Sequence, residues 1–262
     1  MLSRVITLTT DFGCGSPYVA AIKGVILSIH PAAVMVDVTH GIAPQNIRQA
    51  ALVLDEVTPR FPPHTVHVCV VDPGVGTERA VIYARIGNQC YVAPDNGVLS
   101  KLAEREAPSQ IVSITDPQYW LTPLSDTFHG RDLMAPVAAR LSLGLEPALL
   151  GEPRRSLIRL SWPQVETAPG QIAGEVLLVD SFGNLITNIA RPHLEAVPPD
   201  EPVAVYCGEV RINGILRTYG ERPAGHVVAL VGSSGQLELA IVGGSAAREL
   251  GLGAGTPVRV CW

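Results

Sequence analysis

The 262-residue sequence contains no uncharged stretch long enough to cross a lipid bilayer. Its N-terminus also lacks the order of basic, apolar and small residues of a signal peptide, because Asp11 interrupts the only apolar run there. Lys and Arg form no stripe, and the formal net charge of −5 is spread along the chain. These absences argue against a membrane role and against binding to a nucleic-acid backbone. We therefore expect a soluble, cytoplasmic protein.

Cysteine is scarce, and its spacing indicates neither a disulfide framework nor a zinc site. The cysteines are odd in number, far apart and include no Cys-x-x-Cys pair; they are Cys14, Cys69, Cys90, Cys207 and Cys261. His64 and His67 are three apart in an expected strand, where they would point to opposite faces and could not share a metal. We expect reduced thiols in the core and no structural metal.

Apolar strand-like runs alternate with helical patterns from residue 4 to about residue 143. Strands are expected at 4–9, 34–38, 66–71, 80–86 and 110–115, and helices at 17–30, 44–57, 98–105 and 130–143. Ser16 is a good cap for the first helix, and Pro17 suits its first turn. This alternation predicts an N-terminal α/β domain with a mostly parallel sheet.

The pattern changes after a proline-containing segment, residues 144–170. Short runs split by Gly, Pro or Asn follow, as expected for a small, all-β barrel or sandwich. These expected strands are 174–180, 184–189, 202–208, 209–220, 226–232, 236–242 and 256–262. We predict an α/β domain at 1–152, a linker at 153–170 and a smaller C-terminal barrel-like domain at 171–262.

The stretch TTDFG, residues 9–13, opens a glycine-containing turn between a strand and a helix. Gly13 and Gly15 fit a dinucleotide-binding fingerprint, but Tyr18 stands where the third glycine belongs. Asp11 argues against phosphate, because a carboxylate repels pyrophosphate but accepts hydrogen bonds well from a ribose diol. The ligand would then be a nucleoside without phosphates. The alternative is that Asp11 only caps the turn.

Two further loops combine charged groups. VVDPGVGTERA, residues 70–80, brings Asp72 and Arg79 close together, either as an ion pair that holds the loop or as part of a site. DTFHGRDLMAP, residues 126–136, places His129 just ahead of a helix. A lone histidine of this kind can be structural or catalytic.

The turns 179–189 and 231–247 carry polar residues that turn chemistry alone could explain.

Taken in order, TTDFG, VVDPGVGTER, TFHGRD, DSFGN and GSSGQLELA with GGSAA resemble the adenosine-forming S-adenosylmethionine hydrolases, also called hydroxide adenosyltransferases. That family is related to the fluorinating and chlorinating S-adenosylmethionine enzymes. The resemblance covers nearly the whole chain. It implies an N-terminal α/β domain, a C-terminal β barrel, no cofactor, and homotrimers whose sites lie between subunits.

The resemblance also implies roles for individual residues. Asp72, Arg79 and His129 match the catalytic Asp, Arg and His around the nucleophilic water, and Asp11 would hold the ribose hydroxyls. The remaining substrate-binding positions that it implies are Phe128, Asp180, Phe182, Asn184, Ser233 and Glu238. The family's halogenating members carry an aromatic residue where Asp72 stands, and the fluorinating ones a longer loop between the second and third motifs. Both differences favour water over halide.

The expected reaction is hydrolysis of S-adenosyl-L-methionine to adenosine and L-methionine by in-line attack of water on C5′. Asp72, kept ionised by Arg79, would orient the water, and either His129 or Asp72 would receive its proton. Three alternatives remain at this stage: a halogenase that forms 5′-halo-5′-deoxyadenosine, a non-catalytic sensor of S-adenosylmethionine or adenosine, and a dinucleotide-binding oxidoreductase.

Overall fold

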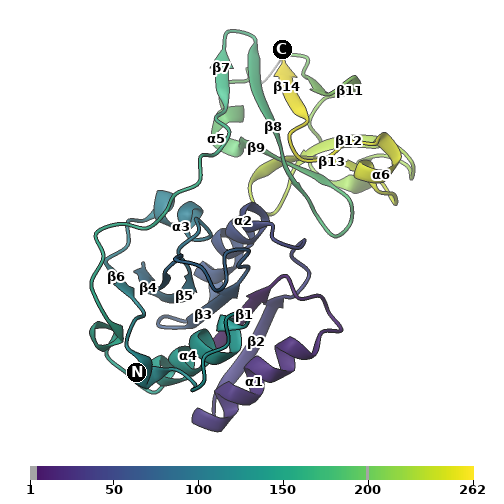
Figure 1. Cartoon of the computed structure of the whole chain (residues 1–262). Coiled ribbons are helices and arrows are strands. Elements are labelled where there is room, and N and C mark those ends of the chain that lie inside the picture. The colour runs from purple at the N-terminus through teal and green to yellow at the C-terminus, as the bar shows by residue number, and fades with distance from the viewer. Residues whose placement is uncertain (1–4, 199–200) are drawn as a thin grey trace. The chain divides into compact units, whose positions relative to one another are not determined.

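A computed structural model describes residues 5–198 and 201–262 of the chain, shown in Figure 1. Its internal contacts form two compact units that divide between Leu160 and Ser161. The first unit is a layered α/β structure, and the second is built mainly of antiparallel strands. In the described part of the chain, no helix is both long and apolar enough to span a membrane.

The first unit contains a six-stranded sheet in the order β2-β1-β3-β5-β4-β6. Neighbouring strands are parallel from β2 to β5, whereas β4 is antiparallel to both β5 and β6. The strands are β1 (Val5–Thr10), β2 (Val34–Thr39), β3 (Val66–Val70), β4 (Val81–Ile86), β5 (Gln89–Pro94) and β6 (Gln110–Ser113). β1 and β3 are adjacent and parallel, so the loops that follow them leave the sheet side by side.

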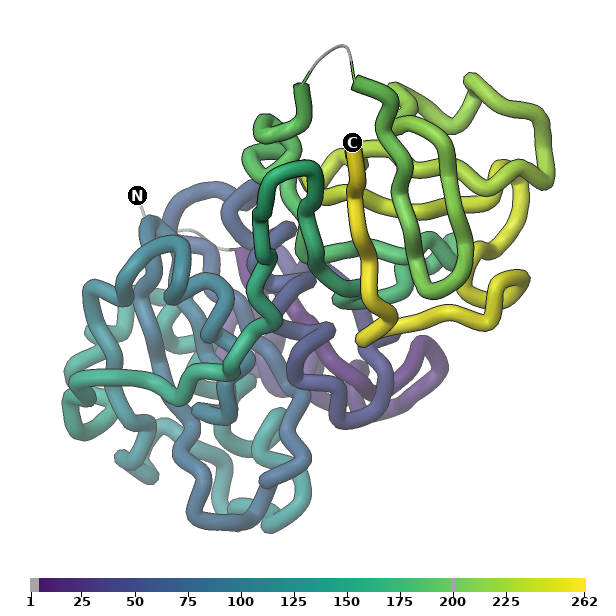
Figure 2. Tube along the Cα trace, turned by 90° about the horizontal axis from the view of Figure 1, so that it is seen from above, coloured from purple at the N-terminus to yellow at the C-terminus, as the bar shows by residue number. Residues whose placement is uncertain are grey.

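Helices cover both faces of this sheet, as Figures 1 and 2 show. Two separate apolar clusters result, one on each face: α1 and α4 pack in the first, and α2 and α3 in the second. The helices are α1 (Pro17–Ile29), α2 (Ile47–Val57), α3 (Ser100–Arg105) and α4 (Ala135–Ser142), and a π-helical turn, Gly130–Met134, leads into α4.

Capping residues set where the first two helices begin. Ser16 accepts a hydrogen bond from the backbone N–H of Tyr18, as the sequence predicts for α1. The second helix begins at Ile47 rather than at residue 44, because the Asn46 side chain accepts from the backbone N–H of Gln49 at 3.0 Å. An N-cap side chain satisfies a donor that has no partner inside the helix.

Three expectations for this unit were wrong. Strand β5 was missed: it pairs with β4 around the two-residue turn Gly87–Asn88, a glycine-containing hairpin signal. His64 lies in a turn with φ of 65° rather than in a strand, so the argument about opposite strand faces does not apply. Cys14 is exposed, whereas Cys69 is buried as expected for a core thiol.

The second unit is a nearly barrel-shaped, eight-stranded antiparallel sheet with one large and one small apolar cluster. Seven strands follow the order β11-β10-β14-β8-β9-β13-β12, and β7 pairs with β8 beside this path. A bridge from Leu216 to Leu230 links the chain after β11 to β12, at the other end of the order. The strands are β7 (Glu166–Ala168), β8 (Gln171–Val179), β9 (Leu185–Ala190), β10 (Ala204–Cys207), β11 (Val210–Asn213), β12 (Val227–Val231), β13 (Gln236–Ile241) and β14 (Pro257–Cys261).

Two details of the second unit differ from the sequence prediction. It is not purely β, because it carries the short helices α5 (Arg191–Leu194) and α6 (Ala246–Leu250). The expected strand 209–220 is a strand only over β11, since Gly214, with φ of 77°, turns the chain and a 3-10 turn forms at Tyr219–Glu221. Helices of four or five residues leave too little periodicity to be recognised from sequence.

Residues 153–160, part of the expected linker, are held on the first unit. The buried carboxylate of Asp95 pairs with Arg154 at 2.9 Å and accepts from the backbone N–H of Ile158 at 2.7 Å. The segment therefore has fixed partners although its sequence shows no periodicity.

Candidate active site

Asp72 and Arg79 lie at the two ends of the loop between β3 and β4. The loop is closed by backbone hydrogen bonds from Val75 to Asp72 and from Thr77 to Gly74. Arg79 donates from Nε to both carboxylate oxygens of Asp72, at 2.8 and 2.9 Å, and from Nη2 to Oδ2 at 2.5 Å. Both side chains are almost fully buried, with 11% and 5% exposed. A bidentate pair of this kind fixes the plane of the carboxylate as well as its distance.

His129 joins the pair from a loop fifty residues further along the chain. Its Nδ1 accepts a hydrogen bond from Nη2 of Arg79 at 2.7 Å. Because a guanidinium has donors only, Nδ1 carries no proton, and the neutral imidazole holds its proton on Nε2. Burial, followed by the charge of Arg79, lowers the pKa of His129 below its ordinary value of 6.5, partly offset by nearby carboxylates.

Two glycines allow the loops of this triad to approach one another. A Cβ on Gly76, which has φ of 77°, would lie 2.3 Å from the carbonyl oxygen of Asp126. A Cβ on Gly130 would lie 2.8 Å from the Val70 side chain at the end of β3. Larger residues at either position would push the His129 segment away from the loop that holds Asp72. The triad thus depends on small residues that carry no chemistry themselves.

A cavity of about 270 Å³ lies beside the triad within the first unit. Asp72 lines it, whereas Arg79 and His129 are not among its lining residues. The lining residues are Asp11, Phe12, Gln45, Val70, Asp72, Pro73, Val75, Thr127 and Phe128. The structure therefore places two of the predicted binding residues, Asp11 and Phe128, at the same cavity as Asp72.

Asp11 faces this cavity from the loop after β1, and its Oδ2 accepts from the backbone N–H of Gln45 at 2.8 Å. Behind it, Thr10 bonds through its hydroxyl to Nδ1 of His40 at 2.9 Å. His40 lies 3.2 Å from Asp37, which pairs in turn with Lys23. This network holds the ends of β1 and β2 together. Sequence reasoning missed His40 and Gln45, whose contacts with residues 30 or more positions away leave no sequence signal.

Aromatic rings form one wall of the cavity. Phe12 and Phe128 meet edge-to-face with centroids 5.8 Å apart, and Tyr18 contacts both rings. The guanidinium of Arg131 lies 4.9 Å from the Phe128 ring centroid and also pairs with Asp132. These contacts hold the Phe128 side chain in place, and Phe128 directly precedes His129 in the chain.

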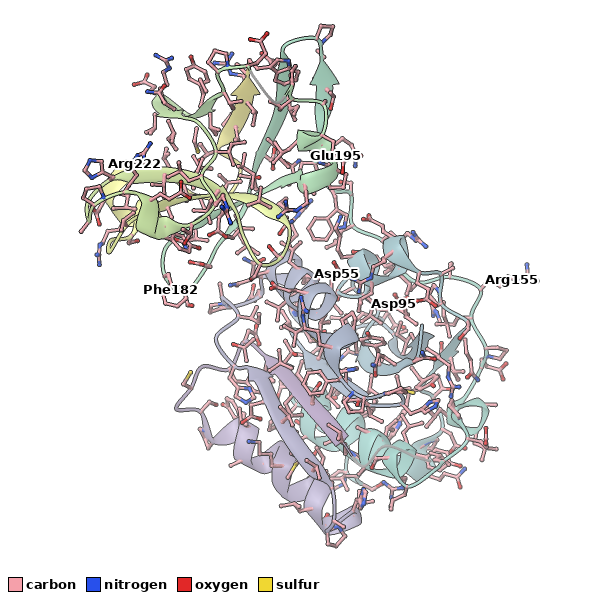
Figure 3. All side chains as sticks on the ribbon, turned by 180° about the vertical axis from the view of Figure 1, so that it is seen from behind. Asp55, Asp95, Arg155, Phe182, Glu195 and Arg222 are labelled. Atoms are coloured by element: carbon pink, nitrogen blue, oxygen red, sulfur yellow. The ribbon has the colours of Figure 1, made fainter. Side chains whose placement is uncertain are left out.

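The predicted binding residues of the second unit form two groups. In the turn between β8 and β9, Oδ1 of Asp180 accepts from the backbone N–H groups of Phe182 and Asn184, and Oδ2 accepts from the Asn184 side chain at 2.9 Å. Phe182 is 77% exposed at the tip of this turn, where Figure 3 labels it. An aromatic ring left this exposed suits contact with a ligand or another chain.

The second group lies on and beside β13. Glu238 is buried, and burial raises the pKa of its carboxyl; the hydroxyl of Tyr219 donates to its Oε1. Ser233 is exposed in the turn between β12 and β13. Tyr219 was not predicted as a site residue, because it fell within the expected strand 209–220 and its partner Glu238 lies 19 positions further along the chain. The structure thus gives Glu238 a partner but shows Ser233 only as a surface residue.

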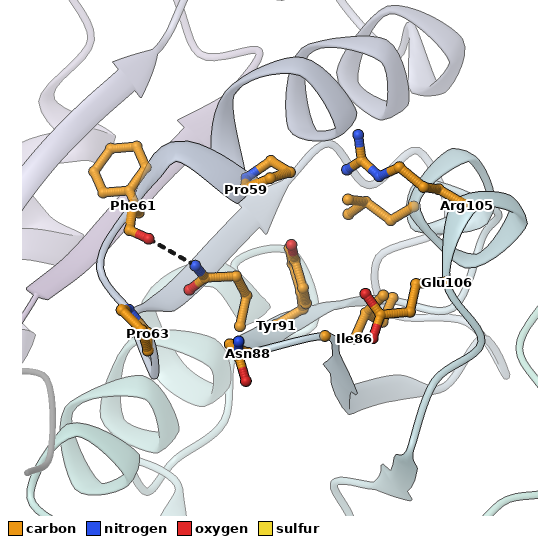
Figure 4. Close-up of a pocket in the computed structure, with 11 residues that line it drawn as sticks. Pro59, Phe61, Pro63, Ile86, Asn88, Tyr91, Arg105 and Glu106 are labelled. Atoms are coloured by element: carbon orange, nitrogen blue, oxygen red, sulfur yellow. Dashed lines mark hydrogen bonds between the residues drawn. The ribbon is translucent and has the colours of Figure 1, made fainter.

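A second cavity, of about 400 Å³, lies elsewhere on the first unit between the turn after α2, the β4–β5 hairpin and α3, as Figure 4 shows. Gln89 inside it donates to the carbonyl of Phe61 at 2.9 Å, and Arg105 and Glu106 stand at its edge. It contains none of the predicted site residues. Among the described residues, no group of three or more His, Cys, Asp or Glu side chains could hold a metal ion.

The site residues fall within two stretches of sequence that match the two domains of one known family. Residues 6–151 match the N-terminal domain of SAM hydroxide adenosyltransferases, and residues 174–259 match the C-terminal domain. The chain belongs to the SAM hydroxide adenosyltransferase family. Both triad loops lie in the first matched range, and the turn that carries Asp180 and the strand that carries Glu238 lie in the second.

Individual relatives agree with this assignment. The (R)-S-adenosyl-L-methionine hydrolase of Thermus thermophilus is 40% identical, over 98% of this chain and 99% of the relative. A crystal structure of an uncharacterized conserved protein from Thermotoga maritima matches with a TM-score of 0.92 and 37% identity, covering 98% of this chain and all of the other. A fluorinase of Actinopolyspora mzabensis is 26% identical over 98% of this chain and 96% of its own. The SAM hydroxide adenosyltransferase family thus spans the whole fold seen here.

Proposed function

We propose that this enzyme hydrolyses S-adenosyl-L-methionine to adenosine and L-methionine by in-line attack of water on C5′. The observation that carries the proposal is the Asp72 carboxylate, which lines the cavity and is held by Arg79, whose guanidinium also donates to His129. Asp11 and Phe128 line the same cavity. The 40% identity to a named hydrolase over nearly the full chain supports the same reaction.

The cavity suits a nucleoside that carries a positive charge. Asp11 accepts hydrogen bonds from the ribose hydroxyls, whereas its charge repels phosphate groups. The two carboxylates at the cavity, Asp11 and Asp72, also favour the sulfonium of the substrate. A dinucleotide cofactor would place its negatively charged pyrophosphate beside Asp11, and the two groups would repel each other.

Asp72 is the group that receives the proton in this scheme. Free hydroxide from water of pKa about 15.7 would cost about 12 kcal/mol at neutral pH, so proton removal accompanies the attack. His129 offers no free acceptor, because its Nδ1 is occupied by Arg79 and its Nε2 carries a proton. The oxygen of water bonds to C5′, the electron pair of the C5′ to sulfur bond leaves with the thioether of methionine, and the proton passes to Asp72.

Arg79 and His129 position this carboxylate. The three hydrogen bonds from Arg79 fix the Asp72 oxygens, and His129 accepts a further hydrogen bond from Nη2 of the same guanidinium. A near-attack geometry, with reacting atoms about 3 to 3.5 Å apart, can supply a large part of the rate enhancement. Since the sulfonium is already a good leaving group, we propose that the reaction uses no cofactor.

The same carboxylates disfavour the halogenase alternative. A halide ion in the cavity would face the charge of Asp11, since the charge of Asp72 is paired with Arg79, whereas a water molecule would donate a hydrogen bond to either carboxylate. We therefore propose water as the nucleophile, although the family includes relatives that are 26% identical and named fluorinases.

The rest of the substrate requires residues beyond the cavity, because 270 Å³ is below the roughly 300 to 1,000 Å³ of pockets that enclose whole ligands. We propose that the C-terminal domain of a neighbouring subunit completes the site in a cytoplasmic homotrimer, with domains at 1–152 and 171–262 joined by the segment 153–170. The residues that we propose to contact adenine and methionine are Asp180, Phe182, Asn184, Ser233 and Glu238.

The decisive experiment is incubation of the purified protein with S-adenosyl-L-methionine in oxygen-18 water. We expect methionine and adenosine that carries the label at its 5′ oxygen. A 5′-chloro or 5′-fluoro product in halide buffer, with little adenosine, would replace the proposal by halogenation. Saturable binding with no loss of substrate would replace it by a sensor.

A further inference from the structure

The turn that follows β5, residues 95–97, contacts both ends of the loop that carries Asp72 and Arg79. Nδ2 of Asn96 donates to the carbonyl oxygen of Val71, the residue before Asp72, at 2.9 Å. The backbone N–H of Asp95 donates to the carbonyl oxygen of Ala80, the residue after Arg79, at 2.8 Å. Two adjacent residues of one turn thus hold the two arms of the triad loop.

This turn is itself firmly anchored. Oδ1 of Asn96 accepts from the backbone N–H of Val98 at 3.2 Å, which fixes the orientation of its amide. The Asp95 side chain is 3% exposed, lies within the first unit in Figure 3, and binds Arg154 and the backbone of Ile158. The turn can therefore act as a rigid reference for the loop.

We propose that Asn96 is a positioning residue for the hydrolysis: by holding the carbonyl of Val71 it sets where the Asp72 carboxylate stands relative to Arg79 and the cavity. The inference rests on the proposed function. Asn96 is not among the residues that line the cavity, and the hydrogen bonds of its side chain go to the backbone of Val71 and Val98, so we infer that it acts through the backbone next to Asp72.

Loss of this hydrogen bond has a specific physical consequence. Val71 is fully buried, so its carbonyl would be left without this donor in a place that water does not reach. The backbone would shift to find another partner, and Asp72, the next residue, would move with it. A displacement of about 1 Å at reacting groups can lower turnover by about 100-fold.

The shift would also be felt at His129. The charged groups that act on this imidazole are Arg79, which lowers its pKa, and Asp72, Asp126 and Asp132, which raise it. When Asp72 moves away, the charge of Arg79 is less compensated at His129. The pKa of His129 then falls further below 6.5, a change that general destabilisation of the fold would not produce.

The test compares Asn96→Ser with Ser100→Ala. A serine at position 96 is neutral and can still accept from Val98 in the turn, but it is too short to reach Val71. The control removes another side-chain hydrogen bond of the same region, from the Ser100 hydroxyl to the carbonyl of Gly97 at 2.6 Å, with no contact to the triad loop. For each protein, kcat and KM for S-adenosyl-L-methionine are measured together with an NMR titration of His129.

We expect Asn96→Ser to lower kcat roughly 10- to 100-fold with little change in KM, and to lower the titration midpoint of His129. Ser100→Ala should retain wild-type values of kcat and of that midpoint. The proposal is overturned if Asn96→Ser leaves kcat and the midpoint unchanged, or if the control changes both equally. If the wild type hydrolyses nothing, the proposed function fails, and the titration alone decides whether Asn96 positions Asp72.

Discussion

Nη2 of Arg79 lies 2.7 Å from Nδ1 of His129, and only the arginine can donate in this contact. The relationship keeps the imidazole neutral in the folded protein. Protonation of Nδ1 would turn the hydrogen bond into a contact between two cations, and the guanidinium would lose one of the partners that orient it toward Asp72.

The fall of kcat at low pH follows from this contact. The pKa of His129 is lowered from 6.5 by burial and by Arg79, so the neutral form persists as the pH falls through 6.5. We expect kcat to fall only below that pH, with a midpoint under 6.5. His129→Asn, whose side-chain oxygen can accept from Arg79 but does not titrate, should not show this fall. A wild-type midpoint above 6.5 would contradict the assignment.

Asp72→Asn is expected to retain substrate binding but lose turnover. The amide cannot take the proton of the attacking water, and general-base catalysis is typically worth about 100- to 10,000-fold. Equilibrium binding and single-turnover rates separate the two effects. Asp55→Asn, at a partly exposed ion pair with Arg105, is the control and should turn over normally. An Asp72→Asn variant with full kcat would remove Asp72 from the chemistry.

Arg79→Lys tests whether geometry or charge matters at the second member of the triad. Lysine keeps the positive charge but cannot donate at once to both oxygens of Asp72 and to His129. We expect kcat to fall about 100-fold with KM nearly unchanged. Arg105→Lys should leave kcat unchanged, because the ion pair of Arg105 with Asp55 lies outside the cavity beside the triad. Equal kcat for the two variants would show that charge alone suffices.

Much of this site could be predicted from sequence because its chemistry lies directly after strands. Asp11 and Asp72 follow β1 and β3, and adjacent parallel strands bring such loops together. For His129 the sequence alone left a structural and a catalytic role open, and only the resemblance favoured the catalytic one, since a single histidine before a helix has no distinctive spacing. Its approach to Arg79 depends on Gly76 and Gly130, whose packing has no local sequence signature.

The missed side-chain contacts share one physical cause: their partners are distant in the chain. Asn96 meets Val71 across 25 positions, and His40 meets Thr10 across 30. Strand β5 belongs to an antiparallel hairpin inside a sheet whose other central pairs are parallel, so the alternating helix-strand pattern concealed it. Tertiary contacts of this kind appear only once the chain is folded.

Asp11→Asn should weaken substrate binding more than it slows the chemistry. The amide keeps one acceptor but loses the charge that strengthens hydrogen bonds to the ribose diol, a difference of about 1 to 2 kcal/mol. We expect KM to rise roughly 5- to 30-fold with kcat within a few-fold of wild type. A fall in kcat with unchanged KM would instead place Asp11 in the reaction itself.

Buried His67 predicts how the fold responds to acid. It lies in β3, accepts from Thr7 at Nδ1 and contacts Gln89 at Nε2, and burial lowers its pKa from 6.5 to about 4. Between these values the unfolded chain binds a proton that the folded chain does not, so the free energy of unfolding falls as the pH falls from 6.5 to 4. Above pH 6.5 His67 is neutral in both states and does not reduce the free energy of unfolding. By pH 4 the mismatch in its pKa has lowered that free energy by up to about 3 kcal/mol.

The variant His67→Gln, which does not titrate, should therefore show a shallower loss of stability across this pH range, even if its stability at pH 7 is lower. Urea unfolding at half-unit pH steps measures the slope directly. The exposed His226→Gln serves as the control and should retain the wild-type slope. If the slopes of wild type and His67→Gln agreed, then protonation of His67 would not oppose folding, and the stack of its ring on Tyr91, 5.1 Å between centroids, would have to tolerate the charge.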